Sequence, residues 1–229
     1  MRRLLALAAA SVAVVAVTAG PAGATDECEG LDVCISVGGP WVVLPAPARG
    51  ERLRRVEYQL ACPRGAVVAG LDAVLGDPRI DVTFLGTLGS PVTPGITTGR
   101  TVVLVAAWAG DAPTFFRPLI GCLPTSGGGR GTTAVVPRPP ERVVRALRVR
   151  PGPARTLVVR CGEGRRLVAS SHAVGIRRRA APTAEMLTAV SVARRDAADR
   201  VTVRARRNGE IAARIRVDVQ VHALCRRDS

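Results

Sequence analysis

The chain has two histidines, and histidine is the side chain that most often acts as a general base in catalysis. His172 follows Ser170 and Ser171, an order that suggests a nucleophile beside a general base. Successive residues of a β-strand point to opposite faces of the sheet, so this run does not by itself bring a hydroxyl to an imidazole. We interpret His172 as a strand residue near the edge of the core, and His222, on the polar face of the last strand, as a solvated residue. No catalytic residue is predicted.

Three aspartates, Asp72, Asp77 and Asp81, are spaced closely enough to suggest a calcium site. Calcium needs six or more oxygen ligands, and no glycine-spaced loop signature surrounds these residues. Asp77 precedes Pro78 and is explained as the start of a turn. Zinc is disfavoured because the chain has two histidines and no C-x-x-C pair, and an oxidising compartment consumes thiolates. We predict neither a metal nor a cofactor.

All 33 basic residues are arginine, and the formal net charge is +15. A complete absence of lysine is typical of GC-rich codon usage, which weakens the total charge as a functional signal. The distribution is more informative. Residues 25–124 hold 8 Arg against 10 Asp and Glu, whereas residues 125–229 hold 23 Arg against 8 Asp and Glu. Codon bias acts on both regions alike, so the asymmetry indicates a cause in packing or in binding.

Six cysteines indicate three disulfides in an exported chain, and they allow 15 pairings. A shift of the sequence by 99 positions places Cys62 on Cys161, and Cys122 recurs slightly late as Cys225. The chain therefore contains two copies of one β-unit, each closed by its own disulfide. The predicted disulfides are Cys62–Cys122, Cys161–Cys225 and Cys28–Cys34.

The first 24 residues have the features of a secretion signal. Arg2 and Arg3 precede the apolar run 4–17, and the small residues Ala22 and Ala24 follow at the positions that a signal peptidase needs. An uncleaved membrane anchor is the alternative, but the apolar run is shorter than the roughly 20 residues of a spanning helix. We predict cleavage after Ala24, a secreted or extracellular location, and no membrane span after cleavage.

The remaining chain reads as short alternating strands between Gly- and Pro-rich turns, with no helical periodicity. Expected strands include Val56–Cys62, Ala66–Leu75, Thr101–Trp108 and Glu185–Ala193. The predicted fold is all-β, with two tandem disulfide-closed β-sandwich-like repeats after a cleaved signal peptide. The predicted divisions are residues 1–24 (signal peptide), 25–40 (an acidic, disulfide-pinned segment), 41–124 (the first repeat), 125–140 (a Gly/Pro-rich linker) and 141–229 (the basic second repeat).

One strand differs between the two repeats in a way that suggests a binding surface. Its inward residues are apolar in both copies, but its outward residues Val103, Val105 and Ala107 become Thr202, Arg204 and Arg206. A strand that is apolar on both faces is usually covered on both. We therefore expect a covered outer face in the first repeat and a cationic outer face in the second. The predicted anion-binding residues are Arg204, Arg206, Arg207 and Arg216.

These features predict an exported, non-enzymatic binding or structural module of the cell envelope or extracellular space. Its expected partner is an anionic cell-envelope polymer, recognised by the basic second repeat, or another secreted protein. Nucleic acid is disfavoured because the second repeat has no Trp, Tyr or Phe to stack on bases. A secreted protease inhibitor is the alternative, with the loop 86–100 as its inhibitory segment. A secreted hydrolase ranks third, because it needs a nucleophile and a base brought together in one cleft.

Overall fold

The computed structural model describes residues 27–28, 33–86, 99–124 and 141–227. The predicted signal peptide and the linker 125–140 lie outside the described residues. The structure is nearly all strand, so the predicted all-β, sandwich-like fold class is confirmed.

The described part of the chain contains thirteen strands and one short helix. We refer to β1–β7 as the first half and to β8–β13 with α1 as the second half. The first half consists of β1 (Ile35–Gly38), β2 (Trp41–Leu44), β3 (Arg54–Ala61), β4 (Ala66–Leu75), β5 (Asp81–Leu85), β6 (Thr101–Trp108) and β7 (Thr114–Pro124). The second half consists of β8 (Glu141–Val149), β9 (Arg155–Arg160), β10 (Arg165–Arg177), α1 (Ala184–Thr188), β11 (Val190–Asp196), β12 (Arg200–Arg207) and β13 (Arg216–Arg227).

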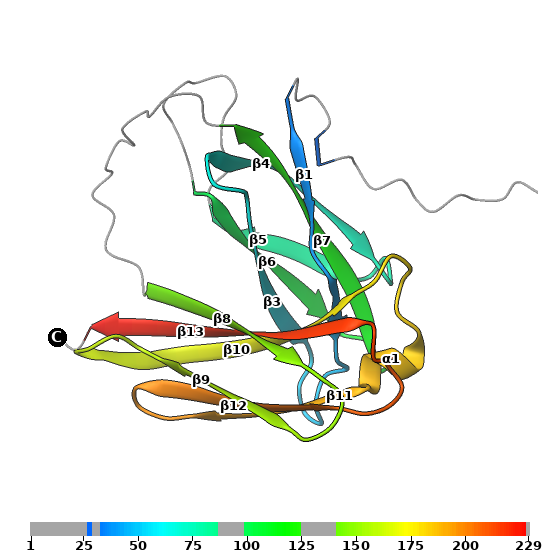
Figure 1. Cartoon of the computed structure of the whole chain (residues 1–229), viewed down its shortest axis with the longest axis vertical. Coiled ribbons are helices and arrows are strands. Elements are labelled where there is room, and N and C mark those ends of the chain that lie inside the picture. Colours follow the sequence, from blue (N-terminus) through cyan, green and yellow to red (C-terminus); the bar gives the residue numbers. More distant parts are fainter. Residues whose placement is uncertain (1–26, 29–32, 87–98, 125–140, 228–229) are drawn as a thin grey trace, which may run out of the picture.

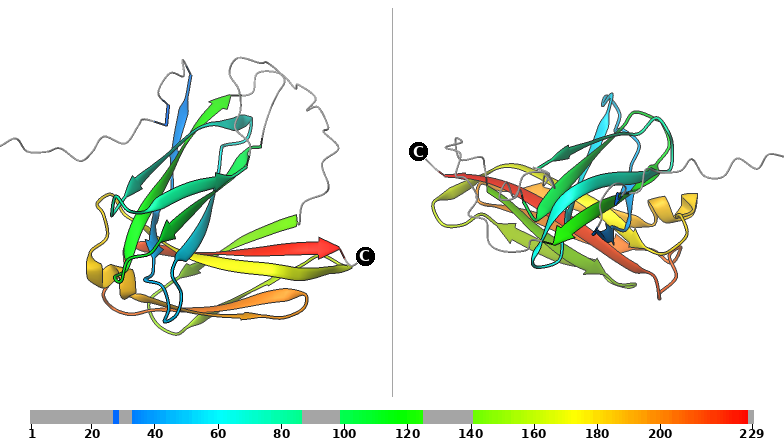
Figure 2. Two further views of the ribbon diagram at one scale, coloured as in Figure 1. Left: turned by 180° about the vertical axis from the view of Figure 1, so that it is seen from behind. Right: turned by 90° about the horizontal axis from the view of Figure 1, so that it is seen from above.

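The strands form three antiparallel sheets (Figure 1). Sheet A has seven strands in the order β1-β7-β2-β10-β13-β8, with β4 also paired to β7. Sheet B has the order β3-β6-β5, and sheet C has the order β11-β12-β9. Sheet B packs on the first-half part of sheet A, and sheet C packs on the second-half part. Each half is therefore a sandwich, and the strands of the two halves cross in space (Figure 2).

Two apolar cores fill the two sandwiches, as the alternation of the strands requires. The first core includes Val56, Tyr58 and Leu60, which lie at alternate positions of β3. The second includes Val201 and Val203, together with Ala205, on β12. Most outward residues of these strands are polar or charged, so the period of two found in the sequence decides which face is buried.

Strand β2 joins the halves by pairing with strands of both. Val42 lies opposite Phe116 of β7 on one side and Gly175 of β10 on the other. Gly175 is required here, because a Cβ at this position would lie 2.6 Å from Cγ of Pro40. The buried Trp41 strengthens the junction, since its indole Nε1 donates to the carbonyl of Arg178 at 3.1 Å. One continuous sheet thus crosses the predicted boundary between residues 41–124 and 141–229.

The strand pairings of the two halves correspond closely. The register of β3 on β6 recurs in β9 on β12 with the partners shifted by 99 residues. A β-bulge follows Val68 in the β4–β7 pair and Leu167 in the β10–β13 pair, and these residues are also 99 apart. The tandem repeat stays a prediction from the sequence, and these matched registers support it.

Three elements, α1, β1 and β8, were not predicted from the sequence. Helix α1 occupies Ala184–Thr188, so the expected strand Glu185–Ala193 is wrong in its first part, and β11 begins only at Val190. Five residues are too few to produce a helical apolar period, which explains why the helix left no signal. Strand β1 was missed because its four residues are mostly exposed and end in glycine.

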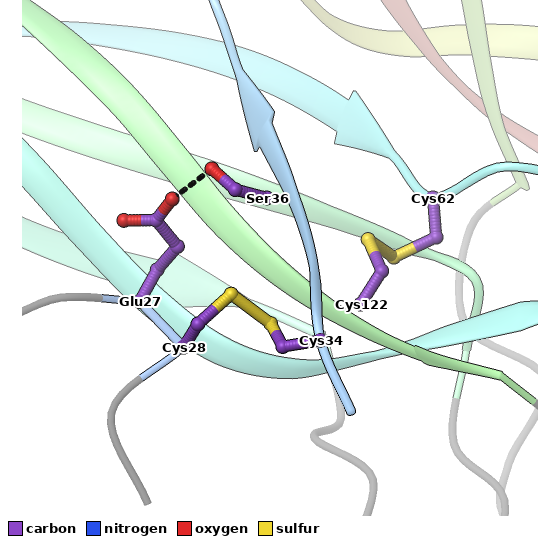
Figure 3. Close-up of a disulfide and its surroundings, with 6 residues drawn as sticks. All are labelled: Glu27, Cys28, Cys34, Ser36, Cys62 and Cys122. Atoms are coloured by element: carbon purple, nitrogen blue, oxygen red, sulfur yellow. Dashed lines mark hydrogen bonds between the residues drawn. A yellow bond between two sulfur atoms is a disulfide. The ribbon is translucent and has the colours of Figure 1, made fainter. Parts of the chain in front are cut away.

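The predicted acidic N-terminal segment rests on the first half in its described part. Its disulfide Cys28–Cys34 is followed by β1, and Ser36 on β1 donates a hydrogen bond to the carboxylate of Glu27 (Figure 3). Gly70 and Gly121 lie opposite each other on β4 and β7. A Cβ at either position would overlap the Glu27 carbonyl oxygen. The two glycines therefore make room for the N-terminal segment against sheet A.

Candidate functional site

Three disulfides brace the molecule. Cys62–Cys122 and Cys161–Cys225 each close a loop within one half, across 60 and 64 residues of sequence. Cys28–Cys34 spans only six residues, and Figure 3 shows it together with Cys62–Cys122. These are the pairs that the 99-residue shift predicts. Three disulfides indicate an oxidising, extracellular environment. In the described part of the chain, no helix is long and apolar enough to cross a membrane.

The outer face of sheet C carries the predicted cationic surface. Arg204 and Arg206 are exposed, and they alternate with the buried inward residues of β12. The register adds neighbours, because Arg195 of β11 lies opposite Thr202 and Arg160 of β9 lies opposite Arg200. We call the set Arg160, Arg195, Arg200, Arg204 and Arg206 the cationic face. The outward positions of the three strands are Thr156, Val158, Arg160, Ser191, Ala193, Arg195, Arg200, Thr202, Arg204 and Arg206, and none of them is acidic.

Within the described ranges, acidic side chains pair with the cationic face at one end only. Asp199, in the turn before β12, lies 3.4 Å from Nη1 of Arg160 and 3.3 Å from Nη1 of Arg200. Arg204 and Arg206 form no ion pair with any described residue. Residues two apart on a strand are about 7 Å apart, so their guanidinium groups can reach neighbouring charges of one extended polyanion.

Arg207 does not belong to this face, contrary to the prediction. Strand β12 continues through Arg207, and because Arg207 directly follows the outward Arg206, its side chain lies on the inner side of sheet C. Arg207 is only 3% exposed. Its guanidinium donates to the carbonyl oxygens of Ile211, Ala212 and Ile215 at 2.8–2.9 Å. Burial lowers its pKa. This arginine anchors the segment that leads into β13.

Arg216 also lies away from the cationic face, because it is on sheet A. It pairs in register with Arg177 of β10, and both guanidinium groups bind the carboxylate of Asp218, at 2.8 and 3.0 Å. Asp218 is only 4% exposed, so this arrangement neutralises a buried acid. Of the four predicted anion-binding residues, Arg204 and Arg206 lie side by side, whereas Arg207 and Arg216 have structural partners.

The second histidine is buried, and the interpretation of His222 as a solvated residue is wrong. Its face of β13 is polar, but the edge strand β3 of the first half covers that face. The amide of Gln220 binds the backbone of Gln59 on β3, accepting from the nitrogen at 2.7 Å and donating to the oxygen at 3.2 Å. This contact satisfies backbone groups that an edge strand would otherwise leave unpaired. His222 lies beside Gln220 and is 1% exposed.

The hydrogen-bond partners of His222 determine which ring nitrogen carries its proton. Nδ1 lies 2.8 Å from Nη1 of Arg142, which can only donate, and Nε2 lies 2.8 Å from the amide oxygen of Gln220, which can only accept. The ring is therefore neutral with its proton on Nε2. Burial, together with the nearby Arg142, lowers the pKa of His222 to about 4. Arg142 in turn donates to the carboxylate of Glu57 at 2.6 Å, which links β8 to β3.

This network places a serine, a histidine and a glutamate together, but in the wrong order for a hydrolase. Ser171 lies directly opposite His222 in the β10–β13 register. Its hydroxyl donates to the carboxylate of Glu57 at 2.8 Å rather than to the imidazole. Both ring nitrogens are occupied and the ring is buried. The cluster joins the two halves and presents no Ser–His pair to a substrate.

One of the three aspartates considered as calcium ligands has a clear structural role. Asp77 accepts hydrogen bonds from the backbone and guanidinium of Arg79, as expected for a turn. No group of three or more His, Cys, Asp or Glu that could hold a metal ion occurs among the residues that the structure describes. The proposed inhibitory loop 86–100 falls mostly outside them, since residues 87–98 are not described.

Comparison with known proteins gives no relative for this arrangement. No protein-family model matches the chain, and neither a search of curated proteins nor a search of solved structures found a similar protein.

Proposed function

We propose that this chain is an exported, non-enzymatic β-sandwich protein that binds anionic polymers of the cell envelope through the cationic face of sheet C. The observation that carries the proposal is the exposed pair Arg204 and Arg206, which has no acidic partner in the described part of the chain. Arginine is suited to this task because its planar guanidinium donates two parallel hydrogen bonds to phosphate or carboxylate.

The surroundings of the pair support a polymer rather than a compact ligand. Sheet C has three strands, and its outward residues between the arginines are short, such as Ser191, Ala193 and Thr202. Such a surface leaves several guanidinium groups accessible along one direction. In the proposal, residues 1–24 direct export and are removed, and the three disulfides stabilise the sandwich outside the cell.

Polymer binding can be tested with a charge-reversed face. The variant with Arg204→Glu and Arg206→Glu should bind polyphosphate and polyglutamate at least tenfold more weakly than wild type at low ionic strength. Binding by wild type should fall steeply as salt is added, because the contacts are electrostatic. Dextran, a neutral polymer, should not bind. Equilibrium titration of labelled polymer across a salt series measures each affinity.

A matched control separates the cationic face from total charge. Arg49 and Arg52 are exposed in the first half and form no ion pair with a described residue. Arg49→Glu with Arg52→Glu changes the net charge by the same amount and should reduce binding less than threefold. The proposal fails if both double variants lose binding equally, or if dextran binds as tightly as the charged polymers.

A further inference from the structure

A cleft of about 730 Å³ lies between the two halves of the molecule. The first half contributes the end of β2, the start of β3 and the segment before β7. The second half contributes β10, α1 and β11. These segments are far apart in sequence, so the cleft exists only because the halves pack together. Its size falls in the range of small-molecule sites, roughly 300–1,000 Å³.

One wall of the cleft is cationic. Arg54 and Arg55 of β3 and Arg194 of β11 line it, and the lining contains no Asp or Glu. Two of these arginines are partly compensated, since Glu51 lies 3.2 Å from Arg54 and Asp196 lies 3.7 Å from Arg194. Arg55 forms no ion pair with a described residue. The wall therefore has a positive charge that is incompletely neutralised.

His172 also lines the cleft. Its Nδ1 is closed to solvent and has no hydrogen-bond partner among the described residues, so this nitrogen is not open to a ligand in the cleft. Burial, followed by the charges of Arg194 and Arg54, lowers the pKa of His172 to about 4, so the ring is neutral at neutral pH. The charge that attracts an anion to the cleft therefore comes from the arginines.

The rest of the lining is largely apolar. The apolar side chains come from β2, β10, α1 and β11, and they are Val43, Val174, Leu187, Val190 and Val192. Cationic and apolar side chains in one cleft match a ligand that has both properties.

We propose that this cleft binds a small organic anion, whose carboxylate or phosphate group contacts Arg55 and Arg194 close to His172 and whose apolar group packs on Val174 and Val192. This site is independent of the cationic face. Arg194 and Arg195 are successive residues of β11, so they point to opposite sides of sheet C. The nucleophile-like neighbour Ser170 takes no part, because its hydroxyl donates to Asp196 at 2.7 Å.

Nuclear magnetic resonance of the two histidines tests the site directly. The chain contains only His172 and His222, and His222 serves as an internal control because it is buried in the network between the halves. Hexanoate and hexyl phosphate should shift the ring signals of His172 with saturation, and should leave those of His222 in place. Acetate, inorganic phosphate and hexanol, which each lack the charge or the apolar group, should bind at least tenfold more weakly. The tighter of the two hexyl ligands identifies the head group.

Variants locate the charge that holds the ligand. Arg55→Gln should weaken hexanoate binding about fivefold, and Arg55→Gln with Arg194→Gln should weaken it more than tenfold. Arg204→Gln with Arg206→Gln removes the same charge from the cationic face and should leave hexanoate binding within twofold of wild type. Arg55 is exposed, so its single variant remains informative if the double variant does not fold. The inference is overturned if hexanol shifts His172 as strongly as hexanoate, or if folded Arg55→Gln binds like wild type.

Discussion

Sheets B and C are built with the same register, yet their outer faces meet different surroundings. In both, apolar residues of the central strand point inward at matched positions, and these residues are buried. Outward on sheet B, Val103 is 5% exposed, and β3 packs on the second half of sheet A through Glu57 and Gln59. Outward on sheet C, Arg204 and Arg206 face solvent. Apolar outward residues therefore mark the covered face of sheet B, and charged outward residues mark the exposed face of sheet C.

The comparison also explains where part of the arginine excess lies. Arg142 and Arg216 of the second half compensate carboxylates at or near the contact with the first half, and Arg207 holds backbone carbonyls. These residues are required by packing, whatever the codon usage. Arg195, Arg204 and Arg206 on the cationic face and Arg55 in the cleft form no ion pair with a described residue, and these are the two places where we propose that anions bind.

The largest expected effect is the loss of a long disulfide, and it tests whether the two long disulfides stabilise their halves equally. By the chain-entropy estimate, loops of 60 and 64 residues each contribute about 4 kcal/mol. Replacing either pair, Cys62 with Cys122 or Cys161 with Cys225, by alanine should lower the free energy of unfolding in urea by about that amount. Replacing both Cys28 and Cys34 by alanine removes a disulfide that spans only six residues, and should lower the free energy of unfolding by about 2 kcal/mol. A difference above about 2 kcal/mol between the two long disulfides would contradict their equivalence.

The second largest loss of stability is expected at the ion pair between Glu57 of β3 and Arg142 of β8, where sheet B contacts the second half. Burial alone would raise the pKa of Glu57, but hydrogen bonds from Arg142 and Ser171 outweigh it and lower the pKa. Glu57→Ala leaves Arg142 largely buried without its counter-charge and should destabilise the fold by about 3 kcal/mol in chemical unfolding. Glu51→Ala is the matched control, because the Glu51–Arg54 pair is largely exposed and should contribute less than about 0.5 kcal/mol. Equal costs for the two variants would show that the contact contributes little.

Acid should weaken the same contact. The folded-state pKa of His222, about 4, lies below its value of about 6.5 in the unfolded chain. Between these values the unfolded chain binds a proton that the folded chain does not, so stability is complete above pH 6.5 and is lost as pH falls toward 4. We expect a loss on the order of 2 kcal/mol from His222, because a protonated Nδ1 would face the Arg142 donor.

Thermal unfolding from pH 7 to pH 4 measures this loss. His222→Gln should flatten the pH profile, and His172→Gln should remove a separate contribution of the same sign, since the pKa of His172 is lowered as well. An unchanged profile in both variants would mean that neither buried ring is responsible.

The smallest expected change in the free energy of unfolding comes from substitutions at two matched outward positions, 103 and 202, which are 99 residues apart. Val103→Thr puts a hydroxyl in a buried position and should cost about 1 kcal/mol. Thr202→Val, its counterpart on the partly exposed face of sheet C, should change the free energy of unfolding by less than about 0.5 kcal/mol. Paired urea titrations resolve the difference. If Thr202→Val were the more costly change, the assignment of covered and free faces would be reversed.

Several features could be predicted from the sequence because they depend on local pattern. The alternation in β3, β6 and β12 identified the buried residues, and the 99-residue shift identified the cysteine pairs and the exposed Arg204 and Arg206. Arg207 was misplaced because its environment depends on where β12 ends, and strand ends are weakly specified by local sequence. His222 was misplaced because a polar strand face indicates solvent only if no other element covers it.

The sequence by itself determined the all-β class, the disulfide framework and the inward face of each strand, since periodicity and covalent spacing act within short segments or repeat along the chain. Only the tertiary structure decided that β2 pairs with strands of both halves, that β3 covers the polar face of β13, and that Arg55, His172 and Arg194 line one cleft. The physical reason is that these contacts join segments far apart in the sequence, as in the hydrogen bond between Gln59 and Gln220, 161 residues apart. No periodicity or spacing in the sequence encodes which outward face of one half meets which edge of the other.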